Sequence, residues 1–243
     1  MTAWRRLVLW DVDGTLLSAR GAGRRALGRA LERVYGTAGL IDGYDFRGKT
    51  DPRIVLDLMG AAGLADAAIR AGFDECFELY ARGLAAEIGD GSGVKVLPGV
   101  AELVRRLHTT PGIMQGLLTG NIEEGARIKL EPTGLHPFFR TGAYGSDHAD
   151  RRQLPSLAAR RAEALVGHHF APGDVLVIGD TPLDVECARA FGAVAVSVAT
   201  GFHPREELAA LRPDLLFDDF ADVERAAALL GGARAGRARR AAR

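Results

Sequence analysis

The stretch Leu7-Val8-Leu9-Trp10-Asp11-Val12-Asp13-Gly14-Thr15-Leu16 decides the fold of this chain. Four consecutive apolar residues lead into two aspartates and a glycine, which is typical of a buried parallel strand that ends in a polar loop. Similar short apolar runs recur at 113–118, 175–178, 194–198 and 215–217. Segments with a helical pattern accompany them at 99–108, 122–133, 154–166 and 182–191. Strands alternating with helices predict an α/β fold with a Rossmann-like parallel sheet.

The stretch from 18 to 94 interrupts this alternation. It has helical patterns at 21–35, 51–59 and 64–88 and no convincing strand. We therefore predict an all-helical cap domain over 18–94, inserted into a core domain made of 1–17 and 95–230. The loops at the borders, near 17–20 and 89–98, are natural hinges.

Composition narrows the class of protein. Of the 243 residues, 47% are hydrophobic and 26% are charged, and the formal net charge is zero, which is ordinary for a soluble globular protein. The residues 231–243 carry five arginines and no acid, which predicts a basic flexible tail after a mildly acidic folded part. Neither nucleic acid nor a membrane is expected as a partner, and without a long apolar run the chain is expected to be cytoplasmic.

Polar side chains follow three of the predicted strands. Asp11 and Asp13 follow the first, Thr119-Gly120-Asn121 follows the strand at 113–118, and Asp180 and Asp184 follow the strand at 175–178. The carboxyl ends of parallel strands meet at one edge of a sheet, so these groups are expected to converge. Two acidic clusters and a hydroxyl at one edge predict a site for magnesium and phosphate.

With these motifs the chain resembles the haloacid-dehalogenase-like hydrolase superfamily over about 7–230. Within it the chain resembles the phosphatase branch with a helical cap, which includes phosphoglycolate phosphatase and β-phosphoglucomutase-like proteins. The resemblance implies the superfamily's fold and Mg²⁺-dependent hydrolysis of a small phosphorylated metabolite. A monomer or a homodimer is expected.

The resemblance also implies roles for single residues. Asp11 would be the nucleophile that forms an aspartyl-phosphate, and Asp13 would be the general acid and base. Thr119 would bind a phosphoryl oxygen, together with the backbone N–H groups of Gly120 and Asn121 at the start of a helix.

The same resemblance implies the protein ligands of the magnesium ion. They would be the carboxylates of Asp11 and Asp180 and the backbone carbonyl of Asp13. Asp184, one helical turn after Asp180, would act through a water molecule.

The family's third motif, a basic residue beside the nucleophile, is ambiguous in this chain. Arg151 is our first choice, Lys129 on the helix after Thr119 is the second, and Arg152 is the third. In the cap, Lys49 of the Arg47-Gly48-Lys49-Thr50-Asp51 stretch is expected to meet an anionic group of the substrate.

Several other functions stay open at this point. A phosphomutase uses the same pair of aspartates, and a phosphonatase would use Lys49 as a Schiff base but lacks the second aspartate. Dehalogenation needs neither an acid at Asp13 nor a metal. A non-catalytic phosphate-binding protein or a receiver-like domain would need neither the paired acid nor a cap of this size.

Overall fold

The computed structural model describes residues 4–232, and these fold around a six-stranded sheet. Its strand order is β5-β4-β1-β6-β7-β8, and every neighbouring pair is parallel. The strands are β1 (Arg6–Trp10), β4 (Ile113–Leu118), β5 (Gly142–Ala143), β6 (Val175–Gly179), β7 (Val194–Val198) and β8 (Leu215–Phe217). The predicted parallel α/β core is confirmed.

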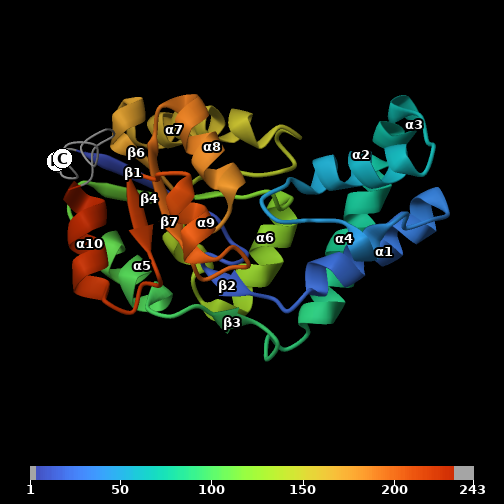
Figure 1. The fold of residues 1–243 in the computed structure, drawn as a ribbon, viewed down its shortest axis with the longest axis horizontal. Coiled ribbons are helices and arrows are strands. Elements are labelled where there is room, and N and C mark those ends of the chain that lie inside the picture. Colours follow the sequence, from blue (N-terminus) through green and yellow to red (C-terminus); the bar gives the residue numbers. More distant parts are fainter. Residues whose placement is uncertain (1–3, 233–243) are drawn as a thin grey trace.

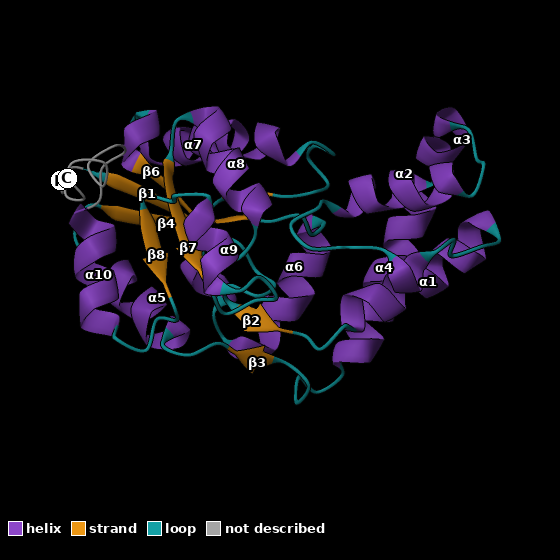
Figure 2. Cartoon of the chain, viewed as in Figure 1, coloured by secondary structure: helices purple, strands orange, loops and turns teal. Residues whose placement is uncertain are grey.

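Helices cover both faces of the sheet (Figure 2). Val8 and Trp10 of β1 belong to an apolar cluster with α5 (Val100–Thr109) and α10 (Val223–Gly232). Leu7 and Leu9 point to the opposite face, in a cluster with α7 (Leu154–Val166) and α8 (Pro182–Phe191). Because both faces are buried, both sets of alternating side chains must be apolar, which explains the unbroken apolar runs in the sequence.

Four helices lie to one side of the sheet, at the right in Figure 1. They are α1 (Ala22–Tyr35), α2 (Asp51–Ala61), α3 (Asp66–Ala71) and α4 (Phe73–Ile88). Their buried apolar side chains are contiguous with the cluster on one face of the sheet. The division into a core of 1–17 and 95–230 and a cap of 18–94 stays a prediction.

The predicted single helix over 64–88 is wrong. Gly72 separates α3 from α4, and an added Cβ at this position would lie 2.8 Å from the ring of Tyr35. The Tyr35 hydroxyl donates a hydrogen bond of 2.7 Å to the Ile69 carbonyl at the end of α3. The break between α3 and α4 therefore lies against Tyr35, which is 37 positions earlier in the chain than Gly72, and no local sequence pattern predicts it.

The two border segments, which we predict as loops and hinges, also contain short strands. Residues Leu17–Ser18 (β2) and Lys95–Val96 (β3) pair as a two-stranded antiparallel ribbon, with Ser18 opposite Lys95. Leu17 also forms a bridge with Asp13. The ribbon lies between the sheet and the four helices (Figure 1). It pairs the two segments that connect the sheet with these helices, and it does so next to Asp13.

The predicted helix over 122–133 is shorter than expected. It appears as α6 (Glu123–Leu130), followed by a 3₁₀ turn at Glu131–Thr133 that contains Pro132. Proline cannot donate the backbone hydrogen bond that would continue the helix.

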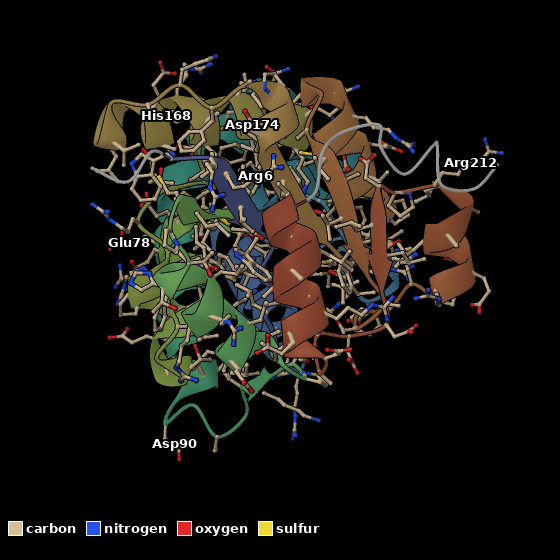
Figure 3. The ribbon with its side chains drawn as sticks, turned by 90° about the vertical axis from the view of Figure 1, so that its left-hand side faces the viewer. Arg6, Glu78, Asp90, His168, Asp174 and Arg212 are labelled. Carbon is tan, nitrogen blue, oxygen red and sulfur yellow. The ribbon has the colours of Figure 1, made fainter. Side chains whose placement is uncertain are left out.

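The opposite end of the molecule holds the start of the sheet. Arg6 opens β1 and its Nη1 atom lies 3.1 Å from the Asp174 carboxylate, and Figure 3 views both from this end. The predicted tail starts too early, because Gly231 and Gly232 belong to α10. The rest of it, 233–243, lies outside the described residues. No helix within 4–232 is long and apolar enough to cross a membrane.

Candidate active site

Three adjacent central strands deliver the polar groups that the sequence singles out. β1 lies between β4 and β6 and leads to Asp11, β4 leads to Thr119, and β6 leads to Asp180. All three side chains are buried at the carboxyl edge of the sheet. They line one cleft of about 850 Å³, which is also lined by residues of α1 and α2. Its lining further includes Asp13, Asn121, Lys129 and Arg151.

The buried carboxylates form a tight cluster. One oxygen each of Asp11, Asp180 and Asp184 lies within 4.8 Å of the others. Burial raises the pKa of Asp11 to about 6, against the opposing effect of Arg151 and with added repulsion from Asp184. Burial and the negative charges of Asp11 and Asp184 raise the pKa of Asp180 well above its ordinary value. A divalent cation would relieve this repulsion, and oxygen ligands suit magnesium, so the donor set fits that ion.

Two glycines, Gly14 and Gly201, leave space for the side chain of Asp180. A Cβ at Gly14, where φ is +81°, would lie 2.4 Å from an Asp180 carboxylate oxygen, and a Cβ at Gly201 would lie 1.7 Å from the same oxygen. The Thr15 hydroxyl donates to the other oxygen at 3.1 Å. Gly14 therefore does more than form the turn after Asp13, because its missing side chain leaves space for the Asp180 carboxylate.

Asp184 has both carboxylate oxygens occupied by protein donors. One accepts from Arg151 Nη2 at 2.5 Å, and the other accepts from the Thr181 backbone N–H at 3.0 Å and from its hydroxyl at 2.7 Å. The bond from the Thr181 backbone N–H is one half of the capping box of α8, and the Asp184 backbone N–H donates to the Thr181 side chain in the other half. These contacts favour an indirect role for Asp184 at a metal site.

Asp13 faces a different set of groups, although it is only two residues from Asp11. Its Oδ2 atom accepts from Lys129 Nζ at 2.6 Å and from Asn121 Nδ2 at 2.8 Å. Lys129 Nζ also donates to Asn121 Oδ1 at 2.6 Å. The Asp13 side chain is 45% exposed, whereas that of Lys129 is 5% exposed. The second aspartate is therefore held by a lysine and an amide while open to the cleft.

Thr119 is joined to this network through its hydroxyl oxygen. That oxygen accepts from Asn121 Nδ2 at 2.8 Å and from the Asn121 backbone N–H at 3.3 Å. With its lone pairs engaged, the hydroxyl keeps its hydrogen for donation to a ligand.

The three basic candidates for the third motif occupy three different places. Arg151 is buried, and its Nη2 atom lies 3.3 Å from Asp11 Oδ1 and 2.5 Å from Asp184. Lys129 touches Asp13 instead, and Arg152 forms an exposed pair with Asp150 at 2.8 Å. The cation beside Asp11 is therefore Arg151.

The loop before α2 is hydrogen-bonded to the carboxyl edge of the sheet. Arg151 Nη1 donates to the Gly48 carbonyl at 3.0 Å, and the Asp51 backbone N–H donates to the Gly120 carbonyl at 2.7 Å. The Asp51 carboxylate accepts from the Ile122 backbone N–H at 2.8 Å. Thr50 caps α2, and Asp51 joins that helix to the Thr119 loop. The sequence does not predict this role of Asp51.

Lys49 lies in the cleft but already has partners. Its Nζ atom lies 2.9 Å from the Tyr44 hydroxyl and 3.9 Å from the Asp57 carboxylate. It also lies 4.0 Å from the centre of the Tyr44 ring. A contact between Lys49 and a substrate stays a prediction.

A family model described as haloacid dehalogenase-like hydrolase matches residues 5–192. The chain belongs to this family.

Its sequence is similar to that of several phosphoglycolate phosphatases. It is 32% identical to the one from Synechococcus elongatus over 131 residues, which are 54% of this chain and 58% of the relative. The chain thus spans about half the length of the first curated relatives it matches. With the phosphoglycolate phosphatase of Pseudomonas syringae it shares 25% identity over 88% of this chain and 76% of the relative.

Solved structures share the fold. CbbY from Rhodobacter sphaeroides, in complex with phosphate, has a TM-score of 0.65 at 21% identity, over 90% of this chain and 96% of that one. A haloacid dehalogenase-like family protein from Streptococcus pneumoniae has a TM-score of 0.62 at 18% identity, over 93% and 99% of the two chains.

Proposed function

We propose that this chain is a Mg²⁺-dependent phosphatase that hydrolyses a small phosphorylated metabolite through a phosphoryl intermediate on Asp11. The observation that carries the proposal is the separation of two neighbouring aspartates into different surroundings. Asp11 lies with Arg151, Asp180 and Asp184, whereas Asp13 lies with Lys129 and Asn121. One carboxylate is thus placed among groups that suit a nucleophile, and the other is open to the cleft, as a proton donor must be.

The metal site would consist of Asp11, Asp180 and the backbone carbonyl of Asp13, with Asp184 acting indirectly. When bound, Mg²⁺ would neutralise charge on the phosphoryl group and on the buried carboxylates. Arg151 contributes a fixed positive charge beside Asp11 and Asp184.

The reaction would proceed in two displacements. An Asp11 oxygen attacks phosphorus, the bond from phosphorus to the ester oxygen breaks, and Asp13 gives its proton to the leaving oxygen. Water then attacks the same phosphorus while Asp13 takes its proton, and the bond from phosphorus to Asp11 breaks to release inorganic phosphate. The Thr119 hydroxyl and the backbone N–H of Gly120 would bind the phosphoryl oxygens. The backbone N–H of Asn121, expected from the sequence to join them, instead donates to the Thr119 hydroxyl oxygen at 3.3 Å.

The experiment compares Asp13→Asn with Asp11→Asn on p-nitrophenyl phosphate. Nitrophenolate is a good leaving group and needs no proton from Asp13, but the second displacement still needs a base. Asp13→Asn should therefore release about one equivalent of nitrophenolate quickly and then turn over slowly, whereas Asp11→Asn should release none.

Asp45→Asn is the matched control, because Asp45 lines the same cleft but pairs with Arg47. It should keep wild-type turnover. Unchanged steady-state turnover in Asp13→Asn would contradict the acid and base role. A sugar phosphate that gives an isomerised product without free phosphate would instead identify a phosphomutase.

A further inference from the structure

The cleft is lined by more cations than the two beside the aspartates. Beyond Lys129 and Arg151, these are Arg20, Arg24, Arg47, Lys49 and Lys95. Three of them are already engaged within the protein. Arg47 pairs with Asp45, Lys49 pairs with Asp57, and Arg24 donates to backbone carbonyls, one of them that of Tyr44, and lies over the Phe46 ring.

Arg20 and Lys95 are different, because neither has a carboxylate partner within residues 4–232. Both are exposed. Lys95 belongs to the ribbon between the sheet and the four helices, and Arg20 lies in the turn that follows it. Lys95 lies opposite Ser18, which also lines the cleft, and Arg20 follows two positions after Ser18. The bridge between Leu17 and Asp13 places this ribbon directly beside the second aspartate.

The backbone at Arg20 is held in an unusual conformation. Its φ of +48° is one of only two positive values at non-glycine residues of the described chain. Its carbonyl accepts from Arg25 Nη1 at 2.9 Å, and Arg25 is itself anchored to Glu87 at 2.8 Å. Left-handed backbone costs a residue with a side chain about 1 kcal/mol or more, and such strain gathers at ligand-binding positions.

We propose that Arg20 and Lys95 form a second anion subsite, which selects phosphate esters whose leaving group carries a carboxylate or a second phosphate. This inference rests on the proposed phosphatase function and specifies its substrate class. One end of the substrate would lie at Asp11 and Thr119, and its second anionic group would lie against the ribbon. The cleft volume of about 850 Å³ is in the upper part of the ordinary range for ligand pockets and leaves room for both ends.

The experiment measures kcat/KM for three esters with the full chain and Mg²⁺. Ethyl phosphate has no second anion, phosphoglycolate has a carboxylate, and fructose 1,6-bisphosphate has a second phosphate. The wild type should prefer one of the two latter esters over ethyl phosphate on the order of tenfold, which is the expected effect of two exposed charge contacts. The double variant R20Q/K95Q should lose that preference and keep its kcat/KM for ethyl phosphate within about twofold.

Arg33→Gln is the matched control, because Arg33 is an exposed arginine of α1 that does not line the cleft. It should leave all three values unchanged. The preferred ester tells whether the subsite takes a carboxylate or a phosphate.

Three results would overturn the subsite. They are a wild type without preference, a preference that survives in R20Q/K95Q, and an equal loss on ethyl phosphate, which would indicate a structural role. A wild type that hydrolyses none of the esters and no p-nitrophenyl phosphate would overturn the proposed function itself.

Discussion

Gly120 offers a sharp test of how the loop before α2 contributes to the site. A Cβ built at Gly120 would lie 2.0 Å from the Lys49 carbonyl oxygen and 2.8 Å from the Lys49 carbonyl carbon. Gly120 does not have a positive φ, so Gly120→Ala meets no left-handed backbone strain. We therefore expect its cost to arise mainly from the contact with the loop.

The structure sets the size of the effect. An ordinary contact needs at least 3.4 Å, so the loop must move by more than 1 Å. Such a shift breaks the bonds from the Asp51 N–H to the Gly120 carbonyl, at 2.7 Å, and from the Ile122 N–H to the Asp51 carboxylate, at 2.8 Å. Two lost hydrogen bonds at about 1 kcal/mol each, with overpacking of about 1–3 kcal/mol, give a total of about 3–5 kcal/mol.

The assay combines urea unfolding with kcat/KM on p-nitrophenyl phosphate. Gly120→Ala should lower the free energy of unfolding by up to this amount, or the loop should detach and kcat/KM should fall more than about tenfold. Gly60→Ala is the control, because Gly60 lies in α2 with no atom within 4 Å of its added Cβ, and it should stabilise the chain by about 0.5–1 kcal/mol. If Gly120→Ala matches the wild type in both measurements, the docking of this loop is refuted.

The remaining predictions concern charge and metal. Excess EDTA should abolish hydrolysis of p-nitrophenyl phosphate, and added Mg²⁺ should restore it; activity that persists in the chelator would remove the metal from the account. Arg151→Lys should lower kcat by about 10²-fold, because one ammonium cannot replace a guanidinium that contacts Asp11, Asp184 and the Gly48 carbonyl, whereas Arg152→Lys should stay within about twofold. Burial raises the pKa of Asp51 to about 6, so the folded chain holds this proton more tightly than the unfolded chain does. The contribution of Asp51 to the free energy of unfolding should therefore fall by up to about 3 kcal/mol between about pH 4 and pH 6, and this fall should be absent from urea titrations of Asp51→Asn.

Much of the fold follows from the sequence because burial on both sheet faces leaves a strong local signal. The strand at Ile113–Leu118 and the helix at Leu154–Val166 have the predicted bounds. The ribbon of Leu17–Ser18 and Lys95–Val96 could not be foreseen, since two-residue strands carry no periodicity and their pairing joins segments almost 80 positions apart. The break at Gly72 could not be foreseen either, because the neighbouring ring belongs to Tyr35, far away in the sequence.

The candidate site was predictable where a motif follows a strand directly. Asp11, Thr119 and Asp180 converge because their strands are neighbours in the sheet. The sequence ranks Arg151 before Lys129 but does not exclude Lys129, because both side chains reach the cleft, where Arg151 contacts Asp11 and Lys129 contacts Asp13. The contact of Asp51 with Ile122 has no sequence signal beyond an acid at the start of a helix.

The most direct test of the account is to locate the phosphoryl group on the chain. Asp13→Asn is mixed with p-nitrophenyl phosphate and Mg²⁺, quenched in acid, digested with pepsin at low pH, where an acyl phosphate survives, and examined by mass spectrometry. We predict one phosphoryl group on the peptide that contains Asp11, labile to hydroxylamine as an acyl phosphate is, and none when Asp11 is also replaced by Asn. A phosphoryl group on another peptide, a hydroxylamine-stable one on Thr15 or Ser18, or nitrophenolate release without any labelled peptide would contradict it.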